Sequence, residues 1–68
     1  MENEQYHVYS DGFGRVLSTR NKWDAHSEAK FYSMIHGKSR IELTTGFVGN
    51  TTQAIIAEFE NGKISLNK

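Results

Sequence analysis

The chain has 68 residues, with eight Lys and Arg against eight Asp and Glu, and it contains no Cys. A chain this short buries only about 60% of the surface that its unfolded form exposes, so we expect residues 1–68 to form one small domain. The absence of cysteine excludes disulfides and thiolate metal sites and favours a reducing compartment. The balanced charge excludes a whole-molecule field that would attract nucleic acid or an anionic membrane.

The start of the chain is polar and acidic, and residues 1–5 are a candidate for disorder. These residues lack the basic start and the apolar stretch of a signal peptide. No apolar run in the sequence approaches the roughly 18 residues that a membrane span requires. We therefore expect a cytoplasmic protein that makes no contact with a membrane.

Two short β-prone runs come first, Tyr6 to Ser10 and Arg15 to Thr19. They are separated by Asp11-Gly12-Phe13-Gly14, which has the residues of a hairpin loop. Phe13 at the tip either folds inward to close the core or stays exposed as a contact residue, and the inward position is favoured.

A helix is predicted from Lys22 to His36. Asn21 is a suitable N-cap, and Asp24 places a carboxylate where the free N–H groups and the helix dipole favour it. Gly37 supplies a stop signal after His36. On the predicted helix, one group of residues clusters on the side expected to face a sheet: Ala25, Ala29, Tyr32 and Ile35.

Three further strands follow the helix. Alternation predicts a strand from Ile41 to Thr45, and the apolar run from Gln53 to Glu60 predicts another, with residues 46–50 as the loop between them. Asn61-Gly62 has the chemistry of a type I′ turn, after which Lys63 to Leu66 pairs back. The order ββαβββ predicts an α+β fold, in which an antiparallel sheet of four to five strands carries one helix on a face.

No catalytic, metal or cofactor site is expected. His26 and His36 are ten residues apart on the predicted helix, about 15 Å along its axis, so they cannot bind one ion. His7 lies on a strand without a visible partner. Asp24 and Glu28 share a helix face in the first turns, where the dipole explains acidic residues without catalysis. Neither a dinucleotide fingerprint nor a phosphate loop is present.

A second apolar side of the predicted helix carries Trp23, Phe31 and Met34, which one helix on one sheet cannot bury together with the first. If successive elements simply reverse direction, the loop that holds Phe47 and Val48 lies beside Trp23. These five residues are the predicted partner-binding surface, for another protein or for a second copy of the chain. The alternative is that loops cover them.

Four basic residues are expected at the opposite end, near the helix C-terminus: Arg15, Lys38, Arg40 and Lys63. Such a patch could hold phosphates, so nucleic-acid contact is the alternative function. Acidic residues are predicted close by and would pair with much of the patch.

In size, neutral charge and arrangement, the whole chain resembles small accessory proteins of phages and mobile elements, such as anti-CRISPR proteins and phage inhibitors of host enzymes. The resemblance is architectural and carries over no individual residue. It implies a non-enzymatic protein-binding module, an inhibitor that occupies a functional surface of a host protein. The alternative is a small nucleic-acid-binding or regulatory protein that uses the local basic patch.

Overall fold

The computed structural model describes residues 3–47 and 50–67. The elements follow the predicted order ββαβββ, and the fold is α+β with one helix and a five-stranded antiparallel sheet. Their bounds are β1 (Asn3–Ser10), β2 (Gly14–Thr19), α1 (Lys22–His36), β3 (Lys38–Phe47), β4 (Asn50–Glu60) and β5 (Lys63–Asn67).

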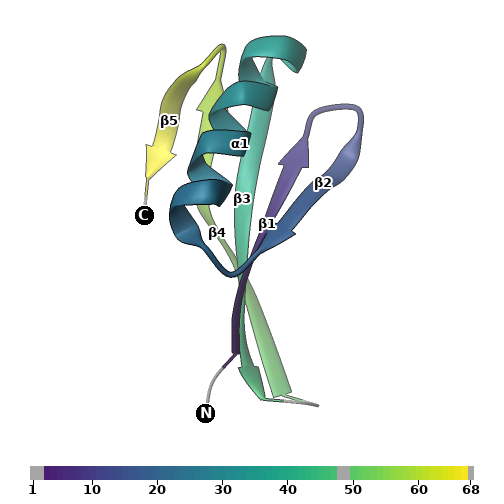
Figure 1. Cartoon of the computed structure of the whole chain (residues 1–68), viewed down its shortest axis with the longest axis vertical. Helices are drawn as coiled ribbons and strands as arrows, with labels where there is room; N and C mark the ends of the chain where they lie inside the picture. The colour runs from purple at the N-terminus through teal and green to yellow at the C-terminus, as the bar shows by residue number, and fades with distance from the viewer. Residues whose placement is uncertain (1–2, 48–49, 68) are drawn as a thin grey trace.

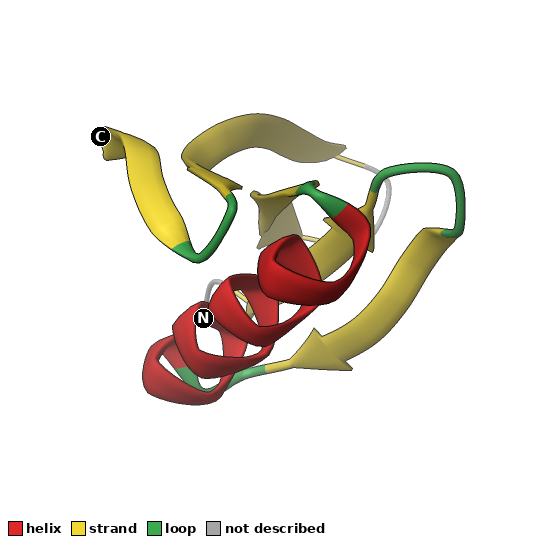
Figure 2. Cartoon of the chain, turned by 90° about the horizontal axis from the view of Figure 1, so that it is seen from above, coloured by secondary structure: helices red, strands yellow, loops and turns green. Residues whose placement is uncertain are grey.

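The strands lie in the order β2-β1-β3-β4-β5, with every neighbouring pair antiparallel. Helix α1 connects β2 to β3 and lies across one face of the sheet, as Figures 1 and 2 show. We call the opposite face, which carries no helix, the open face. This helix, at 15 residues, is not long and apolar enough to cross a membrane, and it is the one helix in the described part of the chain.

The core lies between α1 and the middle of the sheet. Ala25, Ala29 and Ser33 form the buried stripe of the helix, one residue per turn. Their small side chains let the helix backbone approach the strands closely. The buried apolar residues on the strands are Tyr6, Val8, Ile41, Ala57 and Phe59, with Val16, Leu17, Leu43 and Ile56 at the margin.

Both predicted ends of the helix are confirmed. The side chain of Asn21 accepts hydrogen bonds from the backbone N–H of Trp23 at 2.9 Å and of Asp24 at 3.4 Å. At the other end Gly37 has φ of +97°, and its N–H donates to the carbonyl of Ser33. The caps satisfy backbone groups that have no partner inside the helix.

The predicted turn at Asn61-Gly62 is also confirmed. Both residues have positive φ, 52° and 84°, as a type I′ turn requires. The turn is docked on the end of the helix, because the N–H of Asn61 donates to the carbonyl of Gly37 and the N–H of Gly62 donates to Ser33 Oγ, each at 2.9 Å. A sharp local turn is therefore also a tertiary contact.

All five strands are longer than the sequence predicts, and β1, β3 and β4 are longer by at least three residues. Strand β1 begins at Asn3, so residues 3–5 of the segment considered for disorder are in the sheet. Strand β3 continues to Phe47 and β4 begins at Asn50, which corrects the expected loop at residues 46–50. Gly46 stays in the strand with φ of +127°, because it pairs with Asn3 on one side and Thr51 on the other.

The additional strand length forms a projection that we call the arm. It consists of the rows in which only β1, β3 and β4 pair: Asn3–Gln5, Thr44–Gly46 and Thr51–Gln53. Neither β2 nor β5 is paired with these residues in the part of the chain that the structure describes. Figure 1 shows these strands continuing past the start of α1 to the lower end of the molecule.

Candidate functional site

Large apolar side chains are exposed on the side of α1 that faces away from the sheet. Trp23 is 76% exposed, Met34 64% and Phe31 55%. At about 100° per residue these three lie roughly opposite the buried stripe of Ala25, Ala29 and Ser33. We call Trp23, Phe31 and Met34, with Ser27 between them, the outward face of α1.

One helix position differs from the sequence prediction. Ile35 was expected on the sheet side, but it is 56% exposed and adds to the apolar surface of the helix. Ser33 takes the buried position in the last turns. Its hydroxyl donates to the carbonyl of Lys30 and accepts from the N–H of Gly62, so the small polar side chain is fully satisfied beneath the β4–β5 turn.

Met34 links the outward face to that turn. A Cβ added at Gly62 would lie 2.6 Å from Met34 Cγ, so the methionine side chain rests directly on the glycine. The other end of the face is open, at Trp23 in the first turn of the helix. Acidic Asp24 and Glu28 are on one flank of the face and Lys30 is on the other, from the helical spacing.

The outward face of α1 contains three of the five residues of the predicted partner-binding surface. Phe47 is the last residue of β3, and only its backbone is described, while Val48 lies outside the described residues. Figure 1 places the β3–β4 end well beyond the first turn of α1, along the long axis of the molecule. The candidate site is therefore built on the helix, and the contribution of Phe47 and Val48 stays a prediction.

Phe13 is exposed, although the inward position was favoured. Its ring stacks on His36 with centroids 3.9 Å apart and an angle of 16° between the planes, yet 65% of its surface stays accessible. The stacking holds the tip of the β1–β2 loop against the end of the helix. Phe13 is thus an exposed aromatic residue beside the C-terminal end of α1, in addition to Trp23 and Phe31 on the helix itself.

The structure also brings together a serine and a histidine that the sequence does not connect. Ser10 Oγ and His36 Nδ1 are 2.6 Å apart, although 26 residues separate them in the chain. Ser10 is only 3% exposed, beneath the imidazole ring. Within the described residues no carboxylate is hydrogen-bonded to His36, so the pair lacks the third group that orients a catalytic histidine. The contact closes the end of the core.

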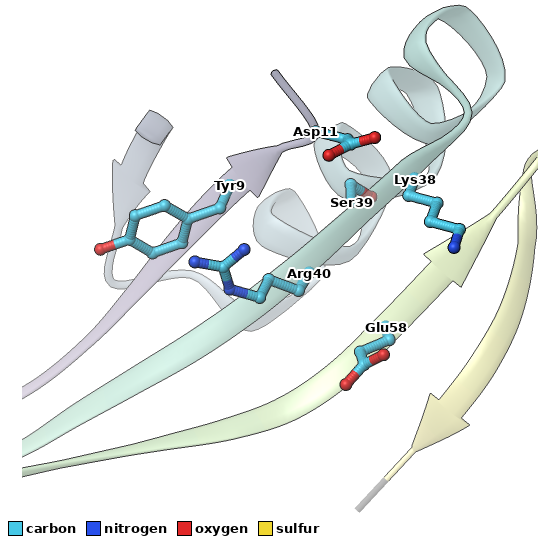
Figure 3. A pocket seen from close by; sticks show the side chains of 6 residues that line it. All are labelled: Tyr9, Asp11, Lys38, Ser39, Arg40 and Glu58. Carbon is cyan, nitrogen blue, oxygen red and sulfur yellow. The ribbon is translucent and has the colours of Figure 1, made fainter. Parts of the chain in front are cut away.

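The four basic residues of the alternative site share the open face of the sheet. Figure 3 shows Lys38 and Arg40 beside Glu58 there, around a depression lined by Tyr9, Asp11, Lys38, Ser39, Arg40 and Glu58. Arg40 lies 4.5 Å above the Tyr9 ring and is paired with Glu42 at 2.8 Å.

Three of the four basic residues have an acidic residue opposite them in the sheet. Arg40 is opposite Glu58, while Glu60 lies between Lys38 and Lys63. Arg15 on β2 is instead opposite Tyr9 on β1. Opposite charges in neighbouring positions cancel much of the field that phosphate groups need.

Each histidine has a separate environment. His7 Nδ1 is 2.8 Å from Ser18 Oγ, and His26 Nδ1 is 3.1 Å from the carbonyl of Lys22. In residues 3–47 and 50–67, no group of three His, Asp or Glu side chains is placed to hold a metal ion.

The chain has no significant match among protein-family models, curated proteins or solved structures.

Proposed function

We propose that this chain is a non-enzymatic protein-binding module that docks on a partner protein through the outward face of α1. The observation that carries the proposal is the exposure of Trp23, Phe31 and Met34 on one face of a well-capped helix. Tryptophan is among the residues most enriched at the centres of protein interfaces. An inhibitor that covers a functional surface of its target would need only such a face.

The spacing of the three residues fits a helix that lies in a groove. Trp23, Phe31 and Met34 are at positions i, i+8 and i+11, with the small Ser27 between them. Amphipathic helices bind apolar grooves through anchors with this helical repeat. The fitting partner has an apolar groove with basic groups at the rim beside Asp24 and Glu28.

The folding of the domain does not require large apolar side chains at these positions. The helix already buries the stripe that faces the sheet, and the outward residues lie on its far side. Replacement of Trp23 or Phe31 by a polar residue therefore removes no contact with the core. Because large apolar side chains are costly to leave in water, the presence of three of them on the outer side of the helix supports a binding role.

Site-specific photo-cross-linking tests the proposal. A photoreactive residue at position 27 lies at the centre of the outward face, and the same residue at exposed position 65 on β5 is the matched control. We expect position 27 to give an adduct with another protein in extracts of the native host, and we expect excess unlabelled protein to compete it away. Position 65 should give none.

Competition with variants decides whether the face itself is recognised. The double variant Trp23→Ser/Phe31→Ser should fail to compete, with at least a 30-fold loss of affinity for two anchors, while Lys22→Ser should compete like the natural sequence. A melting temperature within about 2 °C of the natural protein checks that the double variant is folded. Equal competition by the folded double variant would contradict the proposal.

A further inference from the structure

Strand β4 has an edge that is only partly covered by β5. The described residues of β5 pair with Ala57 to Glu60, and Asn67, opposite Ala57, is the last of them. On the other side of β4, residues Asn50 to Ile55 pair with β3, and Ile56 is the extra residue at a register shift between the two strands. Within residues 3–47 and 50–67, the second edge of the segment Asn50–Ile56 has no strand beside it. The N–H and C=O groups that point to this edge, those of every second residue, are therefore available for pairing.

The composition of this segment favours pairing. Residues 50–56 read Asn-Thr-Thr-Gln-Ala-Ile-Ile, with four β-branched residues and no charge or proline. β-Branched residues favour strands, and charges or proline are the usual protection of an exposed edge. The other exposed edges do carry such protection: Glu4 on the uncovered end of β1, Arg15 on β2 and Lys63 on β5. The unprotected edge is the one that is long and uncovered.

We infer that this edge pairs with the same edge of a second copy of the chain, as an antiparallel β4–β4 ladder centred on Gln53. Full overlap of Asn50–Ile56 with itself places Gln53 opposite Gln53 of the second copy, and Thr51 opposite Ile55. No charged residue meets its equivalent, so self-pairing carries none of the repulsion that like charges cause across a ladder. A two-fold contact of this kind is closed and leaves no further copy to add at β4.

The fold sets the length of the ladder at both ends. Beyond Ile56 the edge of β4 is occupied by β5 of the same chain. Asn50 of one copy faces Ile56 of the other, so at this end too the ladder stops where β5 of the second copy begins to pair. The overlap is therefore about seven residues. Antiparallel strands of one sheet are related by an axis normal to it, so both α1 helices lie on the same face of the joined sheet, with their outward faces directed to the same side.

The self-association does not depend on the proposed function, because it uses a different surface. It adds a consequence if both hold, since two outward faces on one side allow bivalent binding to a repeated or dimeric partner. The fluorescence of Trp23, the one tryptophan in the chain, separates the two surfaces. Dimerisation through β4 leaves Trp23 in water, whereas dimerisation through α1 buries it.

Sedimentation and cross-linking test the inference on the whole chain. The natural sequence contains no cysteine, so Gln53→Cys introduces a unique thiol. In the proposed register the two thiols start from Cβ atoms about 5 Å apart, and a short bis-thiol reagent should join them in high yield. Ser27→Cys on the outward face of α1 is the control and should give little covalent dimer.

A charge at the centre of the ladder should break it. Gln53→Lys places two like charges opposite each other, and we expect the dissociation constant of the dimer to rise at least tenfold. Ser65→Lys adds the same charge on β5 and should leave the dissociation constant unchanged. Gln53→Glu provides a second charge variant if the lysine variant does not fold, which its circular dichroism spectrum will show.

Three results would overturn the inference. One is a monomer at every concentration up to the millimolar range. Another is a dimer whose dissociation constant is the same with folded Gln53→Lys or Gln53→Glu. The third is covalent dimer from Ser27→Cys but not from Gln53→Cys, which would assign self-association to the helix.

Discussion

The half of the sheet beneath α1 and the arm are built from the same three central strands, yet different forces hold them. Beneath the helix, Val8, Ile41 and Ala57 are fully buried. In the arm the corresponding strands carry mostly polar residues, among them threonine and glutamine, and a side-chain hydrogen bond joins Thr45 Oγ1 and Thr52 Oγ1 at 2.9 Å. Packing stabilises the first region, while the backbone ladder stabilises the second.

The difference explains why the interaction surfaces lie where they do. A strand that contributes to a core has its register fixed by the buried face, whereas a polar strand is free to pair further. The helix that covers the core must in turn present its far side to the surroundings. The two proposed surfaces, the outward face of α1 and the free edge of β4, are what remains after the core has formed.

Loss of a core side chain beneath α1 should reduce the stability of the protein more than any other change considered. Ile41→Ala removes a fully buried side chain beneath the helix and should lower the free energy of unfolding by about 2–5 kcal/mol. Thr45→Ala in the arm, on the same strand, should cost less than about 1 kcal/mol. Urea denaturation of both variants gives the two values. Equal losses would show that the arm is packed as tightly as the core.

A substitution in the β4–β5 turn should cause the second-largest loss of stability. Gly62→Ala forces a side chain into a conformation with φ of +84° and against Met34 Cγ. Gly12→Ala, with φ of +81° and no atom within 4 Å of the added Cβ, is the matched control. Both variants should lose about 1 kcal/mol to backbone strain, and Gly62→Ala should lose at least about 1 kcal/mol more from overpacking. Thermal unfolding measures the difference, and identical melting temperatures would refute the docking of the turn on Met34.

Removal of the basic residues on the open face should have the smallest effect on stability and on binding. The double variant Lys38→Ala/Arg40→Ala removes charges that already have acidic neighbours, so its stability should change by no more than about 1 kcal/mol. Its ability to compete in the photo-cross-linking assay should be unchanged. Loss of binding, together with a weaker dependence of binding on salt in the double variant, would instead favour the nucleic-acid alternative.

Local chemistry made the helix and the last turn predictable. Asn21 before the helix, Gly37 after it and Asn61-Gly62 in the turn act through backbone geometry that neighbouring residues decide. The sequence pattern therefore gave these boundaries within one residue. The outward apolar side of α1 was visible as well, because too many large side chains surround a single helix.

Tertiary contacts decided what the pattern missed. Hydrophobicity alone directs Ile35 toward the sheet, but Gly62 binds Ser33 Oγ and fixes the rotation of the last helical turns with the serine inside. Gly46 continues β3 because strands on both sides pair with it. The contact of Ser10 with His36 joins the end of β1 to the end of α1, so no local signal announces it.

The most direct test of the central proposal, that the outward face of α1 is a free surface which a partner covers, is the emission of Trp23. We expect the isolated protein to show the emission of a solvent-exposed tryptophan, at dilute concentration and at concentrations where it dimerises alike. After binding to the partner identified by cross-linking, prepared without tryptophan, the emission should shift to the blue. Blue-shifted emission from the isolated protein, or unchanged emission from the complex, would contradict the proposal.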